Sequence, residues 1–339
     1  MEFNPNGATP NNGNLIGLPY NEDNAKIVLL PIPWDVTVSY SDGTALGPEA
    51  IRDASYQLDL YDADVEDAWK IGLYFRPSDA QVLAKSETYR AKAIQYIAYL
   101  EEGNDVKDSA EMLQILAEIN AACTELKAWV KQETTALLDA GKLVGLVGGD
   151  HSTPLGYLEA LAERHNDFGI LHIDAHFDLR DAYEGFTYSH ASIFYNALKL
   201  PQVSRLVSVG IRDYCEAEVG VVAHEAPRCS VFYDASLRRA QYDGESFKSV
   251  CERIIAELPQ KVYISFDIDG LDPKLCPNTG TPVAGGLEYQ EAVYLLKKVV
   301  DSGRTIIGFD LSEVGNSEWD GNVGARMLYK MANLMAASV

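Results

Sequence analysis

Short runs of valine, isoleucine and leucine recur along the chain and alternate with segments in which apolar residues have helical spacing. Most of these runs are apolar throughout, which is typical of strands covered by helices on both faces of a sheet. The alternation predicts an α/β domain built on a mostly parallel sheet. The expected strands span residues 26–33, 142–149, 168–175, 205–212, 230–234, 261–268 and 305–312.

A long helical segment is predicted between about residues 85 and 140, with a break near the sequence EEGNDVKD at 101–108. Its second half has an apolar stripe in which successive side chains are three or four positions apart. We expect this stripe to pack on the sheet, and a subunit contact is the alternative. The stripe consists of Leu116, Ile119, Cys123, Leu126 and Val130.

The charge of the chain restricts its partners. Its 339 residues include 50 acidic and 28 basic side chains, a net charge of −22, which disfavours nucleic acids and anionic membranes and suits a small cationic substrate. The polar N-terminal residues, 1–25, have no secretory pattern and are expected to form a loose arm, and no segment reaches membrane-spanning length. Five cysteines without a CxxC pair indicate reduced thiols in a cytoplasmic protein.

Unusual polar residues gather where five of the predicted strands end. In open α/β sheets, ligands bind outside the carboxyl ends of the strands, so five independent segments that point there predict one functional site. The residues at these ends are Asp150 and His151, then Asp174, His176 and Asp178, then Asp213, then Asp267 and Asp269, and finally Glu313.

The stretch GILHIDAHFDLR (169–180) has an ionisable residue at every second position from His172 to Asp178. If the segment stays extended, these side chains share one face. Burying such a row is very costly unless the groups hold a cation, because carboxylates and neutral imidazoles bind divalent metals. Asp267 and Asp269 repeat the two-residue spacing and are expected to face the same way.

Six of these groups together suggest a pair of metal ions. Two imidazoles and four carboxylates carry a charge near −4, which two divalent cations balance. The wealth of oxygen favours Mn²⁺ over Zn²⁺, with Ni²⁺ as a less favoured metal that the ligands do not exclude. Paired metals lower the pKa of a water between them, so the chemistry indicated is metal-assisted hydrolysis.

Three ordered motifs, GGDHS (148–152), DAHFD (174–178) and SFDIDGLDP (265–273), resemble the signatures of the ureohydrolase family of arginase, agmatinase and formimidoylglutamase. GTALGPEAIR (43–52), TGTPVAGGL (279–287) and GFDLSEV (308–314) extend the match over most of the chain. The resemblance implies a three-layer α/β/α fold in one domain (26–339), two Mn²⁺ per subunit and a homo-oligomer, trimeric or hexameric. It also implies hydrolysis of a guanidino or formimino carbon–nitrogen bond.

Carried over by position, the resemblance implies two ligand sets that share Asp174 and Asp267. The first metal is expected to bind His151, Asp174, Asp178 and Asp267. The second is expected to bind Asp174, His176, Asp267 and Asp269. His172 has no ligand role in the family, so we expect an ordinary hydrogen-bonded or packing histidine.

Three further residues match positions with roles in the family. Glu313 matches the acid that pairs with the substrate guanidinium, since a carboxylate can accept two hydrogen bonds from a planar cation. His190, in TYSHAS, matches the proton-transferring histidine, although the residue after it departs from the common His-Gly. Asp213 matches an acidic position near the second metal or the substrate.

The identity of the substrate rests on weaker signals. DAHFDLR resembles formimidoylglutamase, whereas SHAS with FYNAL is closer to agmatinase-type sequences. Arg180 can recognise a carboxylate by a forked pair, which favours a guanidino acid, arginine or formiminoglutamate, or it can be tied to Asp181 or Glu184. The segment lacks the Asn-rich loop of arginases. We therefore expect an agmatinase-like hydrolase, with guanidine itself kept open.

Two alternatives from other classes remain at this point. A non-catalytic metal-binding sensor of the same fold has no physical need for all six ligands and Glu313. A zinc deacetylase on a related fold needs only one metal, whereas Asp178 and Asp269 complete a set for two.

Overall fold

The computed structural model describes residues 3–339 and is built on one sheet of eight parallel strands. The strand order is β2-β1-β3-β8-β7-β4-β5-β6. This confirms the predicted α/β class with a parallel sheet. The strands are β1 (Ile27–Ile32), β2 (Leu73–Phe75), β3 (Leu143–Gly148), β4 (Phe168–Ile173), β5 (Val203–Val209), β6 (Cys229–Phe232), β7 (Lys261–Asp267) and β8 (Thr305–Ser312).

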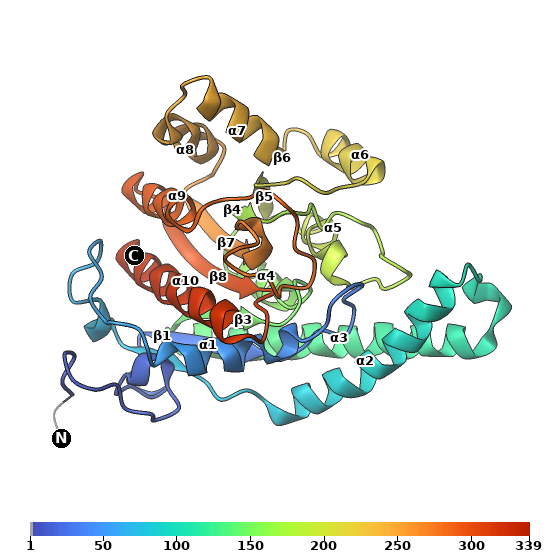
Figure 1. The fold of residues 1–339 in the computed structure, drawn as a ribbon, viewed down its shortest axis with the longest axis horizontal. Coiled ribbons are helices and arrows are strands. Elements are labelled where there is room, and N and C mark those ends of the chain that lie inside the picture. Colours follow the sequence, from blue (N-terminus) through green and yellow to red (C-terminus); the bar gives the residue numbers. More distant parts are fainter. Residues whose placement is uncertain (1–2) are drawn as a thin grey trace.

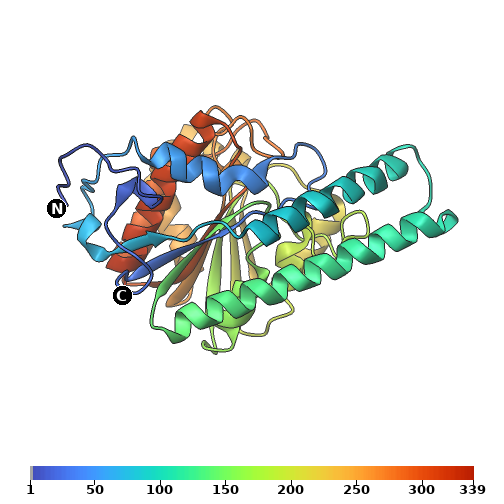
Figure 2. The same ribbon diagram turned by 90° about the horizontal axis from the view of Figure 1, so that it is seen from below.

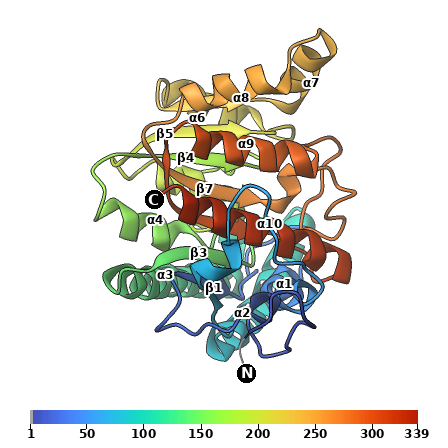
Figure 3. The same ribbon diagram turned by 90° about the vertical axis from the view of Figure 1, so that its left-hand side faces the viewer.

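Within residues 3–339, ten α-helices flank the sheet on its two sides, which gives the expected three layers (Figures 1 and 3). One core lies between the sheet and α1, α8, α9 and α10, and the other lies between the sheet and α2 to α5. The helices are α1 (Gly47–Ser55), α2 (Ala80–Glu101), α3 (Ala110–Asp139), α4 (Leu155–Ala162), α5 (Ile193–Ala197), α6 (Glu216–His224), α7 (Asp234–Tyr242), α8 (Phe247–Ala256), α9 (Tyr289–Asp301) and α10 (Glu318–Ala337).

The seven predicted strands are all present, with shifted ends, and β2 is an additional strand. The strand predicted at 205–212 ends earlier because Gly210 has a φ of 98°, outside the extended region. The segment predicted at 168–175 ends at Ile173, just before the first polar residues of the site.

The predicted helical segment forms a hairpin of two helices, and the break occurs where the sequence indicates. Figure 2 shows α2 and α3 lying side by side and extending past the end of the sheet. The apolar stripe of α3 is buried, as expected, but α3 packs mainly on α4 and α2 and makes fewer contacts with β3 of the sheet. Gly156 of α4 permits this close contact, because a Cβ there would lie 2.2 Å from the carbonyl oxygen of Lys127.

The N-terminal segment is packed more tightly than its polar composition predicts. Leu15 and Ile16 are buried, in the 3-10 helix Leu15–Gly17. The buried side chain of Asn14 donates to the carbonyl of Leu73 at 3.1 Å and accepts from the backbone N–H of Phe75 at 2.8 Å. The expectation of a loose arm is therefore wrong from Asn14 onward, because this side chain serves as a partner for β2.

Candidate functional site

Four adjacent strands of the sheet carry the predicted metal and guanidinium residues. β3, β8, β7 and β4 are neighbours in the sheet, and their carboxyl ends lead into His151, Glu313, Asp269 and Asp174 respectively. Parallel strands end at the same edge, so the sheet order gathers residues that are up to 162 positions apart in sequence.

The chain after β4 does not stay extended, so the expectation that one strand face carries His172 to Asp178 is wrong. β4 ends at Ile173, and Asp178 has a φ of 53°, in the left-handed region. This turn is held by hydrogen bonds, since the carbonyl of Asp178 accepts from the N–H of Phe194 at 3.0 Å. The bend, and not strand alternation, directs the Asp178 carboxylate toward His151.

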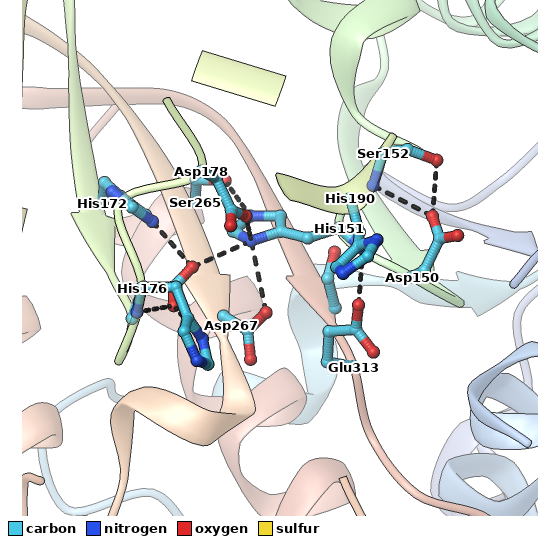
Figure 4. Close-up of polar contacts among 12 residues, drawn as sticks. Asp150, His151, Ser152, His172, His176, Asp178, His190, Ser265, Asp267 and Glu313 are labelled. Carbon is cyan, nitrogen blue, oxygen red and sulfur yellow. Dashed lines mark hydrogen bonds and ion pairs between the residues drawn. The ribbon is translucent and has the colours of Figure 1, made fainter. Parts of the chain in front are cut away.

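His151 lies at the centre of the first predicted ligand set (Figure 4). Its Nδ1 atom is 3.0 Å from Oδ2 of Asp174, 3.1 Å from Oδ2 of Asp178 and 3.2 Å from Oδ2 of Asp267. The turn that carries His151 requires glycine at position 149, because a Cβ there would lie 1.9 Å from the carbonyl oxygen of Trp34. The structure thus brings all four residues of this set together.

The other ring nitrogen of His151 reveals two residues that the sequence analysis missed. Nε2 lies 2.9 Å from Oγ of Ser265, and this hydroxyl donates to Asp310 at 2.7 Å. Since the serine proton is given to Asp310, its oxygen accepts from Nε2–H, which leaves the lone pair of a neutral ring on Nδ1. Ser265 and Asp310 face each other across β7 and β8, and their signal was a buried polar residue in each otherwise apolar run.

The second predicted set centres on His176. Its Nδ1 atom is 3.0 Å from Oδ2 of Asp269 and 3.5 Å from Oδ1 of Asp174. Asp269 lies in the 3-10 helix Ile268–Gly270, where its N–H donates to Oδ1 of Asp267 at 2.8 Å. Asp174 therefore contacts ligands of both predicted sets, and Asp267 contacts His151 of one and Asp269 of the other.

Burial makes this collection of charges unstable unless protons or cations balance it. Asp174, Asp178, Asp267 and Asp269 are at most 5% exposed. Burial and the charge of Asp174 raise the pKa of Asp178 to about 7, and burial and the charge of Asp269 raise the pKa of Asp267. A lone pair of His151 facing three carboxylates at 3.0–3.2 Å is repulsive unless a proton or a metal ion lies between them. The donor set fits divalent metal ions.

His172 is also buried beside this cluster. Its Nε2 atom is 2.8 Å from Oδ2 of Asp174, and its Nδ1 atom is 3.1 Å from Oγ of Ser208. With both ring nitrogens engaged, His172 is placed to orient Asp174, as expected for a hydrogen-bonded histidine. Potential ligand atoms of His172, His151 and Asp174 also lie within 4.8 Å of one another, close enough to hold a metal ion.

Glu313 follows β8 and presents one free oxygen. Its Oε1 atom accepts from the backbone N–H of His151 at 3.0 Å, whereas Oε2 is buried and has no hydrogen-bond partner among residues 3–339. Its backbone φ is 63°, a conformation that costs a non-glycine residue of order 1–3 kcal/mol and that tends to occur at functional sites. Burial and the charge of Asp150 raise the pKa of Glu313, so a cation near Oε2 would be stabilising.

His190 begins the 3-10 helix His190–Ser192 and is held through its backbone. Its N–H donates to the hydroxyl of Thr37 at 3.1 Å, and its buried Nδ1 atom has no hydrogen-bond partner in the described part of the chain. Burial, together with the nearby imidazoles of His176 and His151, lowers the pKa of His190 to about 3. The ring is therefore neutral at pH 7.

The predicted substrate residues and the metal cluster open onto one cavity of about 240 Å³. Arg180 lies over the ring of Tyr183, with its guanidinium carbon 4.7 Å from the ring centroid. Asp213 is exposed at the same cavity. The sequence analysis missed several lining residues, whose types carry no distinctive signal: Ser39, Tyr183, Tyr214, Cys215 and Thr281.

Comparison with known proteins agrees with this geometry. The arginase family model matches residues 25–335. The chain belongs to the arginase family. It is 31% identical over 311 residues to the N(1)-aminopropylagmatine ureohydrolase of Thermus thermophilus, covering 91% of this chain and 89% of that protein. It is 28% identical over 345 residues to the agmatinase of Neisseria meningitidis, with 98% and 95% coverage.

The fold of this arginase-family protein is also that of solved relatives. The agmatine ureohydrolase of Thermoplasma volcanium aligns with a TM-score of 0.71 at 23% identity, covering 96% of this chain and 94% of that one. The predicted ureohydrolase family is confirmed, and the protein is a hydrolase of carbon–nitrogen bonds in linear amidines. Within residues 3–339, none of the helices combines the length and apolar character needed to cross a membrane.

Proposed function

We propose that this protein is a binuclear-manganese hydrolase that cleaves a guanidino carbon–nitrogen bond and releases urea and an amine. One observation carries the proposal: Glu313, whose Oε2 atom is unpaired within residues 3–339, lines the same cavity as Asp178 and Asp267 of the carboxylate cluster. The agmatinases and aminopropylagmatine ureohydrolases among its relatives support an agmatinase-like substrate. A trimeric or hexameric assembly stays a prediction.

The metal ions would be held by the two residue sets that meet at Asp174 and Asp267. His151 is prepared for this role, because Ser265 accepts from Nε2–H and leaves the Nδ1 lone pair directed at the three carboxylates. When bound, the ions supply Lewis-acid activation of a water at neutral pH. The oxygen-rich set favours Mn²⁺, with Ni²⁺ as the less favoured choice.

Glu313 would orient the substrate. Its Oε2 atom accepts an N–H of the guanidinium, and Oε1 stays bonded to the backbone of His151, so the planar cation is fixed relative to the cluster. Gly280 leaves space beside this oxygen, because a Cβ at that position would lie 3.0 Å from Oε2.

His190 would move the proton that the departing amine requires. Its imidazole lines the cavity, and Nδ1 has no hydrogen-bond partner within residues 3–339, so the ring is placed to take a proton from a reacting group and return it to the amine. The bond from its N–H to Thr37 fixes the backbone while the ring is free to engage the substrate.

A second candidate substrate class is a guanidino or formimino compound with a carboxylate at its far end. The specific observation is Arg180, whose guanidinium carbon lies 4.7 Å from the ring centroid of Tyr183 in the lining of the cavity. A guanidinium over an aromatic ring can still bind a carboxylate through its N–H groups. The exposed carboxylate of Asp213 at the same cavity would instead suit the amino end of agmatine.

The test is product release from a panel of substrates by the manganese-loaded protein. Urea is measured with agmatine, arginine, guanidinobutyrate and guanidine, and ammonia and formamide are measured with formiminoglutamate. We expect urea from at least one guanidino compound, with agmatine first. Tight metal binding without any product would favour the sensor alternative and overturn the proposed hydrolase.

A further inference from the structure

The segment between Arg180 and His190 contains a tight turn at residues 183–186. The N–H of Phe186 donates to the carbonyl of Tyr183 at 2.8 Å, and the two residues form an isolated antiparallel bridge. Both central residues have positive φ, 54° at Glu184 and 84° at Gly185. A glutamate in this conformation costs free energy, so contacts from outside the turn must stabilise it.

These contacts come from the α2–α3 hairpin. Asn120 of α3 donates from its side-chain amide to the carbonyl of Gly185 at 3.1 Å and accepts from the N–H of Thr187 at 2.9 Å. Phe186 is buried, and its ring centroid lies 5.3 Å from that of Tyr96 of α2. One asparagine thus ties both sides of the turn to α3, while an aromatic pair ties its apolar side chain to α2.

The packing at Gly185 is close as well. A Cβ at this glycine would lie 3.1 Å from Cδ2 of Leu116 and 3.2 Å from the hydroxyl oxygen of Tyr96. The turn therefore fits closely against both helices, and a larger residue would require these side chains to shift.

The turn carries Tyr183, which touches two residues of the proposed substrate site. The guanidinium of Arg180 lies over its ring at 4.7 Å, and the imidazole of His190 meets the ring edge-on, with centroids 6.0 Å apart at 86°. All three residues line the cavity that also contains Glu313. The position of Tyr183 therefore limits where the side chains of Arg180 and His190 can lie.

The same hairpin also holds the loop on the other side of His190. Arg90 of α2 donates from Nη1 to the carbonyls of Val36 at 3.3 Å and Val38 at 2.5 Å. Between these residues lies Thr37, whose hydroxyl accepts from the N–H of His190 at 3.1 Å. Two loops that meet at His190 are thus anchored to one pair of helices.

We propose that the α2–α3 hairpin is the support that sets the geometry of the substrate pocket. Asn120 is a positioning residue that acts through the turn at 183–186, and Tyr183 determines specificity by holding Arg180. The part of this inference that concerns substrate rests on the proposed function, whereas the anchoring of the turn does not.

Anchoring is tested by amide hydrogen exchange of the full-length, manganese-loaded protein. Asn120→Ala removes both bonds to the turn, and Asn120→Asp keeps the acceptor for Thr187. Gln114→Ala is the matched control, because Gln114 is exposed on the same helix and bonds to Glu118 of that helix. We expect exchange of residues 183–190 to rise about tenfold in Asn120→Ala, less in Asn120→Asp and not in the control.

Kinetics test the consequence for the substrate. In Asn120→Ala we expect the KM of a substrate with a charged far end to rise about tenfold, while guanidine, which has no far end, changes less than threefold. Metal content should equal that of Gln114→Ala. Asn120→Asp should recover part of the KM, and it replaces the alanine variant if that protein does not fold.

The outcomes separate this inference from the proposed function. Unchanged exchange in Asn120→Ala overturns the anchoring, whether or not any substrate is hydrolysed. Faster exchange with unchanged KM overturns the positioning role and keeps the anchor as a purely structural one. If the unaltered protein hydrolyses no guanidino or formimino compound, the proposed function fails, and the exchange result alone decides the anchoring.

Discussion

The backbone N–H of His151 donates to Oε1 of Glu313 at 3.0 Å and joins the carboxylate cluster to the proposed guanidinium acceptor. The two residues lie 162 positions apart in sequence, after neighbouring strands of the sheet. Because one Glu313 oxygen is fixed on the turn that carries His151, the free oxygen has a defined position relative to the cluster. In the proposed function, this one contact would couple substrate orientation to metal binding.

Glu313→Gln should lose most turnover and raise KM. The amide keeps a carbonyl oxygen for the N–H of His151, but it weakens a charged hydrogen bond worth roughly 1.5–3 kcal/mol. Steady-state kinetics with the best guanidino substrate measure the change, and metal analysis serves as the control because Glu313 is in neither ligand set. Unaltered kcat and KM would remove Glu313 from substrate recognition.

His190→Asn should chiefly lower kcat, by about 10²–10⁴-fold, because general acid–base catalysis contributes an effect of this size. Asparagine retains the backbone N–H that donates to Thr37, so the local fold and the metal content are expected to stay unchanged. The measurement is kcat under saturating substrate. A variant that retains kcat within twofold would show that protons move by another route.

Arg180→Ala distinguishes the two substrate classes. With a carboxylate-bearing substrate, the loss of a charged pair should raise KM roughly 10–100-fold. Agmatine and guanidine should be little affected or bind better, because a nearby positive charge is removed. Arg326→Ala, an exposed arginine on α10, is the control. If all substrates keep their KM, Arg180 serves the structure only, through its contact with Tyr183.

Asp174→Asn and Asp267→Asn should lower metal occupancy more than Asp269→Asn does. The first two carboxylates contact residues of both predicted sets, whereas Asp269 belongs to one. Metal content after dialysis, measured per chain for the three purified variants, compares them directly. Equal occupancy in all three would contradict the assignment of Asp174 and Asp267 as shared ligands.

The sequence predicted most of the fold because its strands are nearly continuous apolar runs flanked by helical patterns. It did not predict β2, since Leu73–Phe75 is too short to give a pattern and is completed by Asn14 from a distant segment. It also placed the end of β4 at residue 175, whereas the strand ends at Ile173. Motif spacing shows that polar groups are close in sequence, but not the positive φ of Asp178 that turns the chain.

The predicted site residues gather at one edge of the sheet, but the residues that support them depend on tertiary contacts. Ser265 and Asp310 meet only through the register of β7 and β8. Asn120 bonds to residues 65 and 67 positions later, through a polar side chain that looks ordinary on an exposed helix surface. Predicting such contacts requires knowledge of how the chain folds in space, which a single sequence does not provide.

The most direct test of the central claim is urea release by metal-free protein that is titrated with Mn²⁺. The four buried carboxylates and the two imidazoles fit divalent cations, so chelation should abolish turnover. We expect Mn²⁺ to restore it better than Ni²⁺ or Zn²⁺, with activity saturating near two ions per chain by metal analysis. Full turnover in metal-free protein, or saturation at one ion per chain, would contradict the two-metal account.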